Sequence, residues 1–144
     1  MIRPLERKDR AAYLAMARDF YDSPAVDHPV PTAFLEKTFD TLMAGTPYAE
    51  AYVFEEAEGL AGYALLAKTW SQEAGGLTVW LEELYVIPQR RGSGLGRQFF
   101  AWLKSRPNPA RYRLETEPDN DRAKALYLRE GFRPLRYESF ILGD

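Results

Sequence analysis

The chain has 144 residues, a formal net charge of −2, one histidine and no cysteine. This length predicts a single domain over residues 1–144, and the charge argues against nucleic acid as a main partner. The lack of cysteine excludes thiolate nucleophiles and cysteine-bound metals, and a lone histidine argues against a Ser-His-Asp triad. Because no secretory signal and no apolar run of about 20 residues are present, we expect a cytoplasmic protein that does not enter membranes.

In chain order, the first half is predicted to form a short strand, two helices and a two-stranded hairpin. Apolar residues spaced three and four apart indicate the helices, and Asp9 and Thr32 are candidates to cap them. A proline-rich loop separates the two helices. The predicted bounds are residues 2–5 for the strand, 9–21 and 32–44 for the helices, and 49–55 and 60–68 for the hairpin.

The second half is predicted to alternate strands with helices. The strands are expected at residues 77–86, 112–117 and 137–142, and the helices at about 93–105 and 120–130. This order predicts a mixed α/β fold of the α+β type, with a central mixed sheet of about six to seven strands. The N-terminal part of the sheet is expected to be antiparallel, and about four helices flank it.

The segment Gln89–Gly96 carries two arginines and three glycines between a strand and a helix. Glycines let backbone N–H groups approach an anion, and a helix N-terminus adds free donors and partial positive charge. The segment therefore predicts a pyrophosphate site, or else a tight turn without a ligand. It does not end in the Gly-Lys-Ser/Thr of a P-loop, and antiparallel strands upstream argue against a dinucleotide-binding fingerprint.

Two strings resemble signatures of the GCN5-related N-acetyltransferase (GNAT) family. Gln89-Arg90-Arg91-Gly92-Ser93-Gly94 is similar to Q/R-x-x-G-x-G/A, and the string from Asn120 to Phe132 is similar to N-x-x-A-x-x-x-Y-x-x-x-G-F. The strand Leu81–Val86 resembles the corresponding strand of the diamine acetyltransferase branch. The resemblance extends over the whole order of elements.

This resemblance implies an enzyme that uses acetyl-CoA and no metal. The backbone of one strand would pair with the pantetheine arm, the glycine-rich loop would hold the pyrophosphate, and an asparagine would contact the arm where two strands diverge. The residues implied to bind acetyl-CoA are Leu84, Tyr85, Val86, Arg91, Gly92, Ser93, Gly94, Leu95, Gly96, Arg97 and Asn120.

Glu82 and Glu83 are candidates for the general base. An alkylamine has a pKa of about 10.4 and must lose a proton before it can attack a thioester. Strand alternation predicts that the two carboxylates lie on opposite faces. The resemblance favours Glu82 as the base, with Glu83 or a purely structural ion pair as alternatives. It also implies that Tyr127 protonates the leaving CoA, unless Tyr127 is only a core residue.

Tyr21, Asp22, His28 and Glu83 are the candidate contacts to the acceptor, although ordinary solvated positions remain an alternative for the first three. The expected reaction is direct transfer of an acetyl group to a primary amine, such as a polyamine or an amino acid. A protein or peptide N-acetyltransferase and a non-catalytic acyl-CoA sensor are the alternatives. The apolar last strand, Tyr137–Leu142, also suggests a homodimer.

Overall fold

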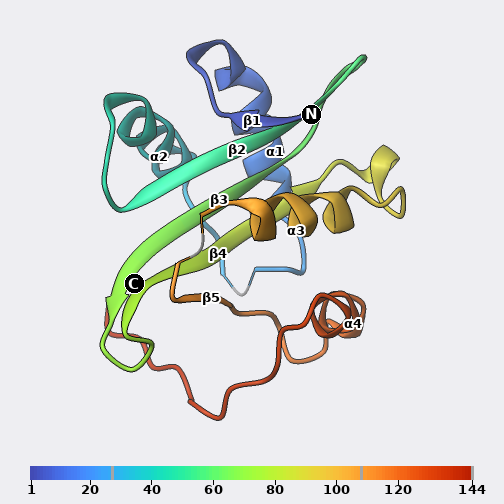
Figure 1. Ribbon diagram of the computed structural model, residues 1–144. Coiled ribbons are helices and arrows are strands. Elements are labelled where there is room, and N and C mark those ends of the chain that lie inside the picture. The colour runs from blue at the N-terminus through green and yellow to red at the C-terminus, as the bar shows by residue number, and fades with distance from the viewer. Residues whose placement is uncertain (27, 108, 144) are drawn as a thin grey trace.

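The computed structural model describes residues 1–26, 28–107 and 109–143. Five strands form one sheet in the order β1-β2-β3-β4-β5 (Figure 1). Neighbouring strands are antiparallel from β1 to β4, whereas β5 is parallel to β4. The strands are β1 (Ile2–Pro4), β2 (Ala49–Glu56), β3 (Gly59–Ser71), β4 (Gly76–Val86) and β5 (Arg111–Leu114).

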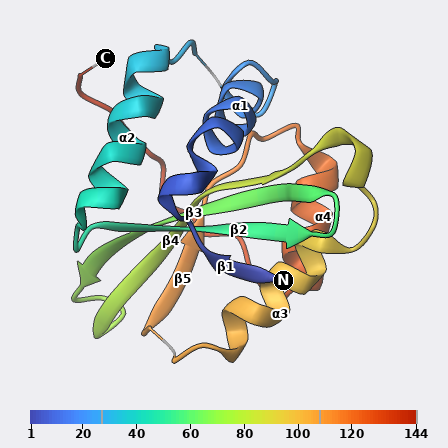
Figure 2. The same ribbon diagram turned by 90° about the horizontal axis from the view of Figure 1, so that it is seen from above.

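Helices cover both faces of this sheet (Figure 2). Helices α1 (Arg10–Tyr21) and α2 (Thr32–Ala44) pack on one face over a core that includes Tyr13, Phe39 and Tyr63. Helices α3 (Leu95–Ser105) and α4 (Asp121–Arg129) lie on the other face, over a core around Phe99 and Phe100. The predicted mixed α+β architecture is confirmed. No helix within the described residues is long and apolar enough to cross a membrane.

The sheet has fewer strands than the six to seven predicted, because the expected strand at Tyr137–Leu142 does not form. Tyr137 donates a hydrogen bond to Glu73 in the β3–β4 turn, and Ser139 donates one to Glu115 just beyond β5. These two contacts hold the segment beside β5 without pairing it to the strand. Strand β5 is also shorter than predicted, because its ladder with β4 ends at Leu114.

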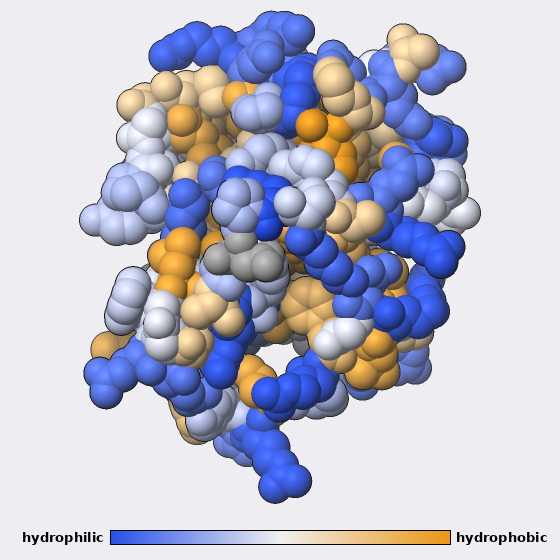
Figure 3. Space-filling view, in the orientation of Figure 1, coloured by the Kyte–Doolittle hydropathy of each residue, from blue (hydrophilic) through white to orange (hydrophobic). Residues whose placement is uncertain are grey.

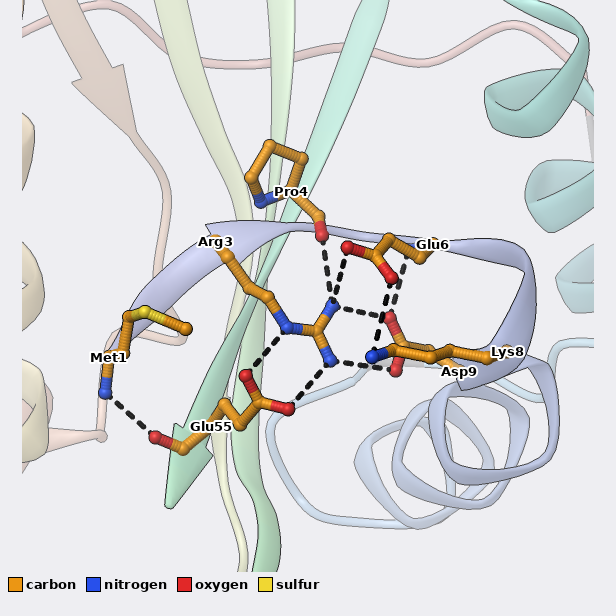
Figure 4. Close-up of polar contacts among 7 residues, drawn as sticks. All are labelled: Met1, Arg3, Pro4, Glu6, Lys8, Asp9 and Glu55. Carbon is orange, nitrogen blue, oxygen red and sulfur yellow. Dashed lines mark hydrogen bonds and ion pairs between the residues drawn. The ribbon is translucent and has the colours of Figure 1, made fainter. Parts of the chain in front are cut away.

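A buried ion pair joins β1 to the start of α1 (Figure 4). The Arg3 guanidinium donates to both carboxylate oxygens of Asp9, at 2.8 and 3.0 Å, and its Nε donates to Glu55 at 2.9 Å. Asp9, only 5% exposed, also accepts the backbone N–H of Glu6. Asp9 therefore does not cap α1 with its side chain, contrary to the sequence-based expectation, because Arg3 and Glu6 occupy its oxygens.

Replacing Asp9 by alanine should lower the free energy of unfolding by about 1–3 kcal/mol, because Arg3 loses two charged hydrogen bonds but keeps its pair with Glu55. The hydrogen bonds from Arg3 hold the pKa of Asp9 below its usual value. The wild type should therefore lose this stabilisation as the pH falls below about 4, since protonation of Asp9 then favours the unfolded chain. Urea unfolding from pH 7 to pH 3 measures both effects.

Glu6→Ala is the matched control. The Glu6 side chain is 52% exposed, and its Oε1 lies 3.8 Å from Nη1 of Arg3. Such exposed pairs contribute about 0–1 kcal/mol. Equal losses in the two variants would contradict the role assigned to Asp9.

Candidate active site

Strands β4 and β5 separate at one defined point. Their parallel ladder pairs Thr78–Leu81 with Arg111–Leu114 and then stops. The next residue on β4 is Glu82, and the first residue after β5 is Glu115. The end of the ladder therefore forms a fork, with one carboxylate at the start of each diverging chain.

Glu82 is the extra residue of a β-bulge. On β3, Leu65 pairs with Glu83 and the adjacent Leu66 pairs with Leu81, so Glu82 has no partner across the ladder. A bulge interrupts strand alternation and redirects side chains. Leu81 consequently packs into the core beneath α3, whereas Glu83 turns toward α1.

The surroundings of Glu82 favour its protonated form. The side chain still reaches solvent, but packing around the fork removes part of its hydration and the nearby charge of Glu115 opposes its ionisation. Both effects raise the pKa of Glu82, the loss of hydration more than the charge. A carboxylate of raised pKa is a better proton acceptor than an ordinary glutamate.

Glu83 is engaged by two tyrosines. It is 7% exposed, and its oxygens accept hydrogen bonds of 2.5 Å from the hydroxyls of Tyr21 on α1 and Tyr63 on β3. Burial raises the pKa of Glu83, and the two hydroxyl donors act in the opposite direction. Tyr21 and Glu83 were both predicted to contact the acceptor amine. In the structure they are hydrogen-bonded to each other. This arrangement ties α1 to the strand that carries Glu82.

A cavity of about 470 Å³ adjoins the diverging ends of β4 and β5. Its walls come from the end of β4, the end of α1 with the loop after it, and the loops before α3 and α4. Five residues implied to bind acetyl-CoA line it, together with others that the motifs did not indicate. The lining residues are Leu84, Tyr85, Val86, Arg91 and Asn120 from the implied set, and Phe20, Ser23, Pro24, Ala25, Glu117 and Asp119 in addition.

The glycine-rich loop presents free backbone donors at the start of α3. Gly92 and Gly94 have φ values of 76° and 89°, which favour glycine, and no side chain caps the helix. A side chain at Gly94 would enter open space, whereas one at Gly96 would lie 3.4 Å from Leu126. Gly94 therefore leaves open space before α3, and Gly96 lets α3 pack against Leu126 of α4.

The two arginines of the loop have different partners. Arg90 pairs with Glu56 through contacts of 2.6 and 2.7 Å. Arg91 donates to the backbone carbonyl of Val86 at 2.9 Å and lies 3.8 Å from Asp19, which accepts the hydroxyl of Tyr85. Arg90 is therefore committed to a structural ion pair, and Arg91 sits at the cavity.

A third arginine near the loop was not found from the sequence. A side chain at Gly92 would lie 3.7 Å from the guanidinium of Arg122, in the first turn of α4. Arg122 follows Asn120 by two residues, so its position within the second motif could have indicated it. Arg97, which the resemblance implied, is exposed on α3.

Asn120 has a structural role as well as a place in the cavity. Its side-chain oxygen accepts the N–H of Ala123 at 3.2 Å and so caps α4.

The other two residues predicted to contact the acceptor amine, Asp22 and His28, lie away from this cavity. Asp22 is exposed and paired with Arg18, and His28 is exposed and lines neither this cavity nor the larger one beside β5.

Tyr127 packs between aromatic rings of the core. Its ring centroid lies 6.0 Å from that of Phe100 and 6.1 Å from that of Phe132. It lines the second cavity, of about 620 Å³, which lies between β5, α3, α4 and the C-terminal segment. Burial raises the pKa of Tyr127, so its hydroxyl stays protonated at neutral pH.

Comparison with known families identifies the class of protein. The Acetyltransferase (GNAT) family matches residues 12–132, which is most of the chain. The chain therefore belongs to this family, and the prediction of an N-acetyltransferase is confirmed. The diamine branch is not distinguished by this match. No curated protein matches the chain significantly.

Solved structures share the fold at low sequence identity. A possible acetyltransferase from Clostridium difficile 630 has 18% identity and a TM-score of 0.84, with 100% of this chain and 97% of that chain covered. AAC(6')-Iy, solved with a bisubstrate analog of CoA, has 14% identity and a TM-score of 0.79, with 100% and 97% covered. Ribosomal-protein-alanine N-acetyltransferase from Brucella melitensis biovar Abortus 2308 has 14% identity and a TM-score of 0.75, with 100% and 98% covered.

Proposed function

We propose that this acetyltransferase moves the acetyl group of acetyl-CoA directly to a primary amine of a small molecule, such as a polyamine or an amino acid. The observation that carries the proposal is the fork between β4 and β5. Glu82 forms the bulge at this fork and lines neither described cavity, but it precedes Leu84 by two residues, and Leu84 lines the cavity that contains the strand and loop residues implied to bind the acetyl donor.

The residues around the cavity fit acetyl-CoA. The diverging ends of β4 and β5 leave the backbone of Leu84–Val86 on a cavity wall, where an extended pantetheine arm can hydrogen-bond to it. The uncapped start of α3, the open position at Gly94 and the guanidinium of Arg122 suit a pyrophosphate. When bound, acetyl-CoA supplies an acetyl group activated as a thioester.

Glu82 is assigned the role of general base. It removes a proton from the ammonium form of the acceptor, directly or through one water, and so exposes the nitrogen lone pair. Its raised pKa brings it closer to neutral pH, which improves this transfer. The backbone N–H groups at the end of β4 are available to polarise the acetyl carbonyl. Because the chain has no cysteine, the proposal involves no cysteine-linked acyl-enzyme.

A panel of acceptors tests the proposal. The protein is incubated with acetyl-CoA and with diamines, amino acids or short peptides, and free CoA is measured. Turnover with small amines above the peptide rate is the expected result. Preferential turnover of peptides would instead favour the protein or peptide N-acetyltransferase alternative, and acetyl-CoA binding without turnover of any acceptor would contradict the proposal.

Tyr127 is assigned the role of proton donor to the departing CoA thiolate, although it lines the larger cavity and not the one lined by Leu84–Val86. Replacing it by phenylalanine should lower kcat by about 100-fold, the lower end of the effect of a general acid. The effect should be at the lower end because a thiolate leaves more readily than an alkoxide. KM for acetyl-CoA and the melting temperature should change little. Steady-state kinetics and thermal unfolding are the measurements.

Tyr112→Phe is the matched control for Tyr127→Phe. Tyr112 lines the same larger cavity, but its hydroxyl donates to the backbone carbonyl of Leu103. This variant should keep the wild-type kcat. An unchanged kcat in Tyr127→Phe would assign Tyr127 to the core alone.

A further inference from the structure

The larger cavity, of about 620 Å³, runs along the outer edge of β5, which pairs with no further strand in the described part of the chain. It reaches the point where the ladder with β4 ends, because Leu114, Glu115 and Thr116 all line it. Figure 3 shows a hollow in the lower part of the molecule, with apolar and hydrophilic side chains around it. The cavity therefore offers an apolar ligand a place beside the fork. Its apolar walls include Phe100, Leu103, Leu128 and Phe132.

The charged groups that line this cavity are mostly positive. Five cations face two carboxylates: Lys104, Arg111, Arg113, Lys124 and Arg133 against Glu115 and Glu130. Glu130 is paired with Lys104 at 2.8 Å, and Arg111 is paired at 3.1 Å with Glu73, which is not part of the lining. The net charge of the lining therefore attracts an anionic group and repels a second ammonium group of a ligand.

Arg113 is held in place and still has donors to offer. Its guanidinium lies 4.3 Å from the ring centroid of Trp80, its neighbour across the ladder. Stacking fixes the plane of the guanidinium and leaves the N–H groups at its edges available. No carboxylate of the described residues forms an ion pair with Arg113, and Glu73, whose pKa it helps to lower, is bonded to Arg111 and Tyr137. Arg113 can therefore bind a ligand carboxylate through two parallel hydrogen bonds.

The groups proposed to act on the acceptor lie close to Arg113. Glu115 follows it by two residues, about 7 Å along an extended chain, and Glu82 is the first residue of β4 beyond the same end of the ladder. Tyr127, the proposed proton donor to CoA, lines the same cavity as Arg113. A ligand whose carboxylate is bound to Arg113 therefore has the fork and its proposed base at one end, and the apolar walls beside it.

We propose that the acceptor is an α-amino acid with an apolar side chain, and that Arg113 binds its carboxylate in the larger cavity. Arg113 then determines the specificity of the proposed acetyl transfer, on which this role rests. The amine nitrogen forms a bond to the acetyl carbon while the C–S bond of the thioester breaks. Of the two protons that the ammonium loses, one ends on the CoA thiol and the other in solvent. The products are an N-acetyl amino acid and free CoA.

Three amines that share an unbranched five-carbon chain test the proposal. Norleucine carries a carboxylate on the carbon next to nitrogen, pentylamine lacks it, and 1,5-diaminopentane has a second ammonium group at the far end. We expect kcat/KM for norleucine to exceed that for pentylamine by about 10–100-fold, the effect of charged hydrogen bonds. The diamine should be the poorest acceptor of the three, because its second charge meets a cationic lining.

The apolar walls predict a dependence on side-chain length. Along the series from alanine to norleucine, KM should fall about fourfold for each added CH₂, because each methylene leaves water for the cavity. A KM that stays constant along this series would exclude these walls as the site of the side chain.

Arg113→Gln separates the role of the arginine from the different basicities of the amines. It should lower the norleucine-to-pentylamine ratio of kcat/KM by about 10–100-fold, through the KM of norleucine. KM for acetyl-CoA should be nearly unchanged, because Arg113 does not line the smaller cavity. Arg106→Gln is the matched control, because the Arg106 guanidinium also stacks on a tryptophan, 4.9 Å from the ring centroid of Trp102, but lines neither described cavity. It should keep the wild-type ratio.

Calorimetric titration of norleucine into the protein with free CoA measures binding without turnover. Binding that Arg113→Gln weakens, with no acetylation of any acceptor, would support the carboxylate site and contradict the proposed function instead. A higher kcat/KM for 1,5-diaminopentane than for norleucine, or an unchanged norleucine affinity in folded Arg113→Gln, would overturn the proposal and leave acetyl transfer to small amines intact. Should the melting curve show that this variant does not fold, the wild-type ranking of the three amines decides.

Discussion

Glu82→Gln should lower kcat by about 10²–10⁴-fold at neutral pH, the range observed when a general base is lost. Glutamine keeps the size and polarity of the side chain at the bulge but cannot accept the ammonium proton. Acetyl-CoA binding should be nearly unchanged, because Glu82 does not line the cavity of about 470 Å³ proposed to hold acetyl-CoA. Stopped assays of CoA release, combined with calorimetric titration of acetyl-CoA, separate the two quantities.

The pH profile gives this prediction a second readout. Glu82 acts only when deprotonated, and its pKa is raised, so the wild-type rate should fall as the pH drops through a value above that of an ordinary glutamate. This acidic limb should disappear in Glu82→Gln. Glu115→Gln should shift the limb to lower pH, because it removes a charge that opposes ionisation of Glu82.

Glu83→Gln is the matched control at the next position of the strand. Glu83 is buried and bonded to two tyrosines, so its loss should lower the melting temperature more than kcat. A larger fall in kcat for Glu83→Gln than for Glu82→Gln would transfer the role of base to Glu83.

Gly94→Asp should weaken acetyl-CoA binding by at least about 100-fold, because like charges in contact cost several kcal/mol. The new carboxylate would stand in the open space before α3, where the proposed site holds a pyrophosphate. It would also compete for the free N–H groups of the helix. Calorimetric titration with acetyl-CoA measures the loss.

Gly75→Asp is the control for the backbone strain that Gly94→Asp introduces at a positive φ. Gly75 has a φ of 77° against 89° for Gly94, and a side chain there also meets nothing within 4 Å. It lies in the β3–β4 turn and lines neither described cavity. The two variants should be destabilised alike, and only Gly94→Asp should lose acetyl-CoA. Equal affinities would place the pyrophosphate elsewhere.

Most of the fold was predictable because local patterns determine it. Prolines, glycines and the spacing of apolar residues placed α1 to α4 and β1 to β4 within a few residues of their observed bounds. The strand at 137–142 was wrong, because its apolar residues favour a strand but do not specify a partner. Pairing depends on contacts far along the chain, here those of Tyr137 with Glu73 and Ser139 with Glu115.

The site was predictable at the level of motifs but not of geometry. The first motif located the loop before α3, yet nothing local showed that Arg90 would pair with Glu56. The bulge at Glu82 was also hidden, because it is defined by the register of β3 against β4. The tyrosines that hold Glu83 come from α1 and β3, and only tertiary packing brings them together.

Arg91 occupies a backbone acceptor that acetyl-CoA would use in the proposed complex. In this structure its Nε already donates to the Val86 carbonyl, the acceptor that the pantetheine arm would use. In the proposed complex, a pantetheine N–H would share this carbonyl oxygen with the arginine or displace it, and a displaced guanidinium would be free to approach the phosphates. Without acetyl-CoA, the Val86 carbonyl therefore still has a hydrogen-bond donor. In the proposed complex, Arg91 would couple binding of the pantetheine arm along β4 to neutralisation of the pyrophosphate charge.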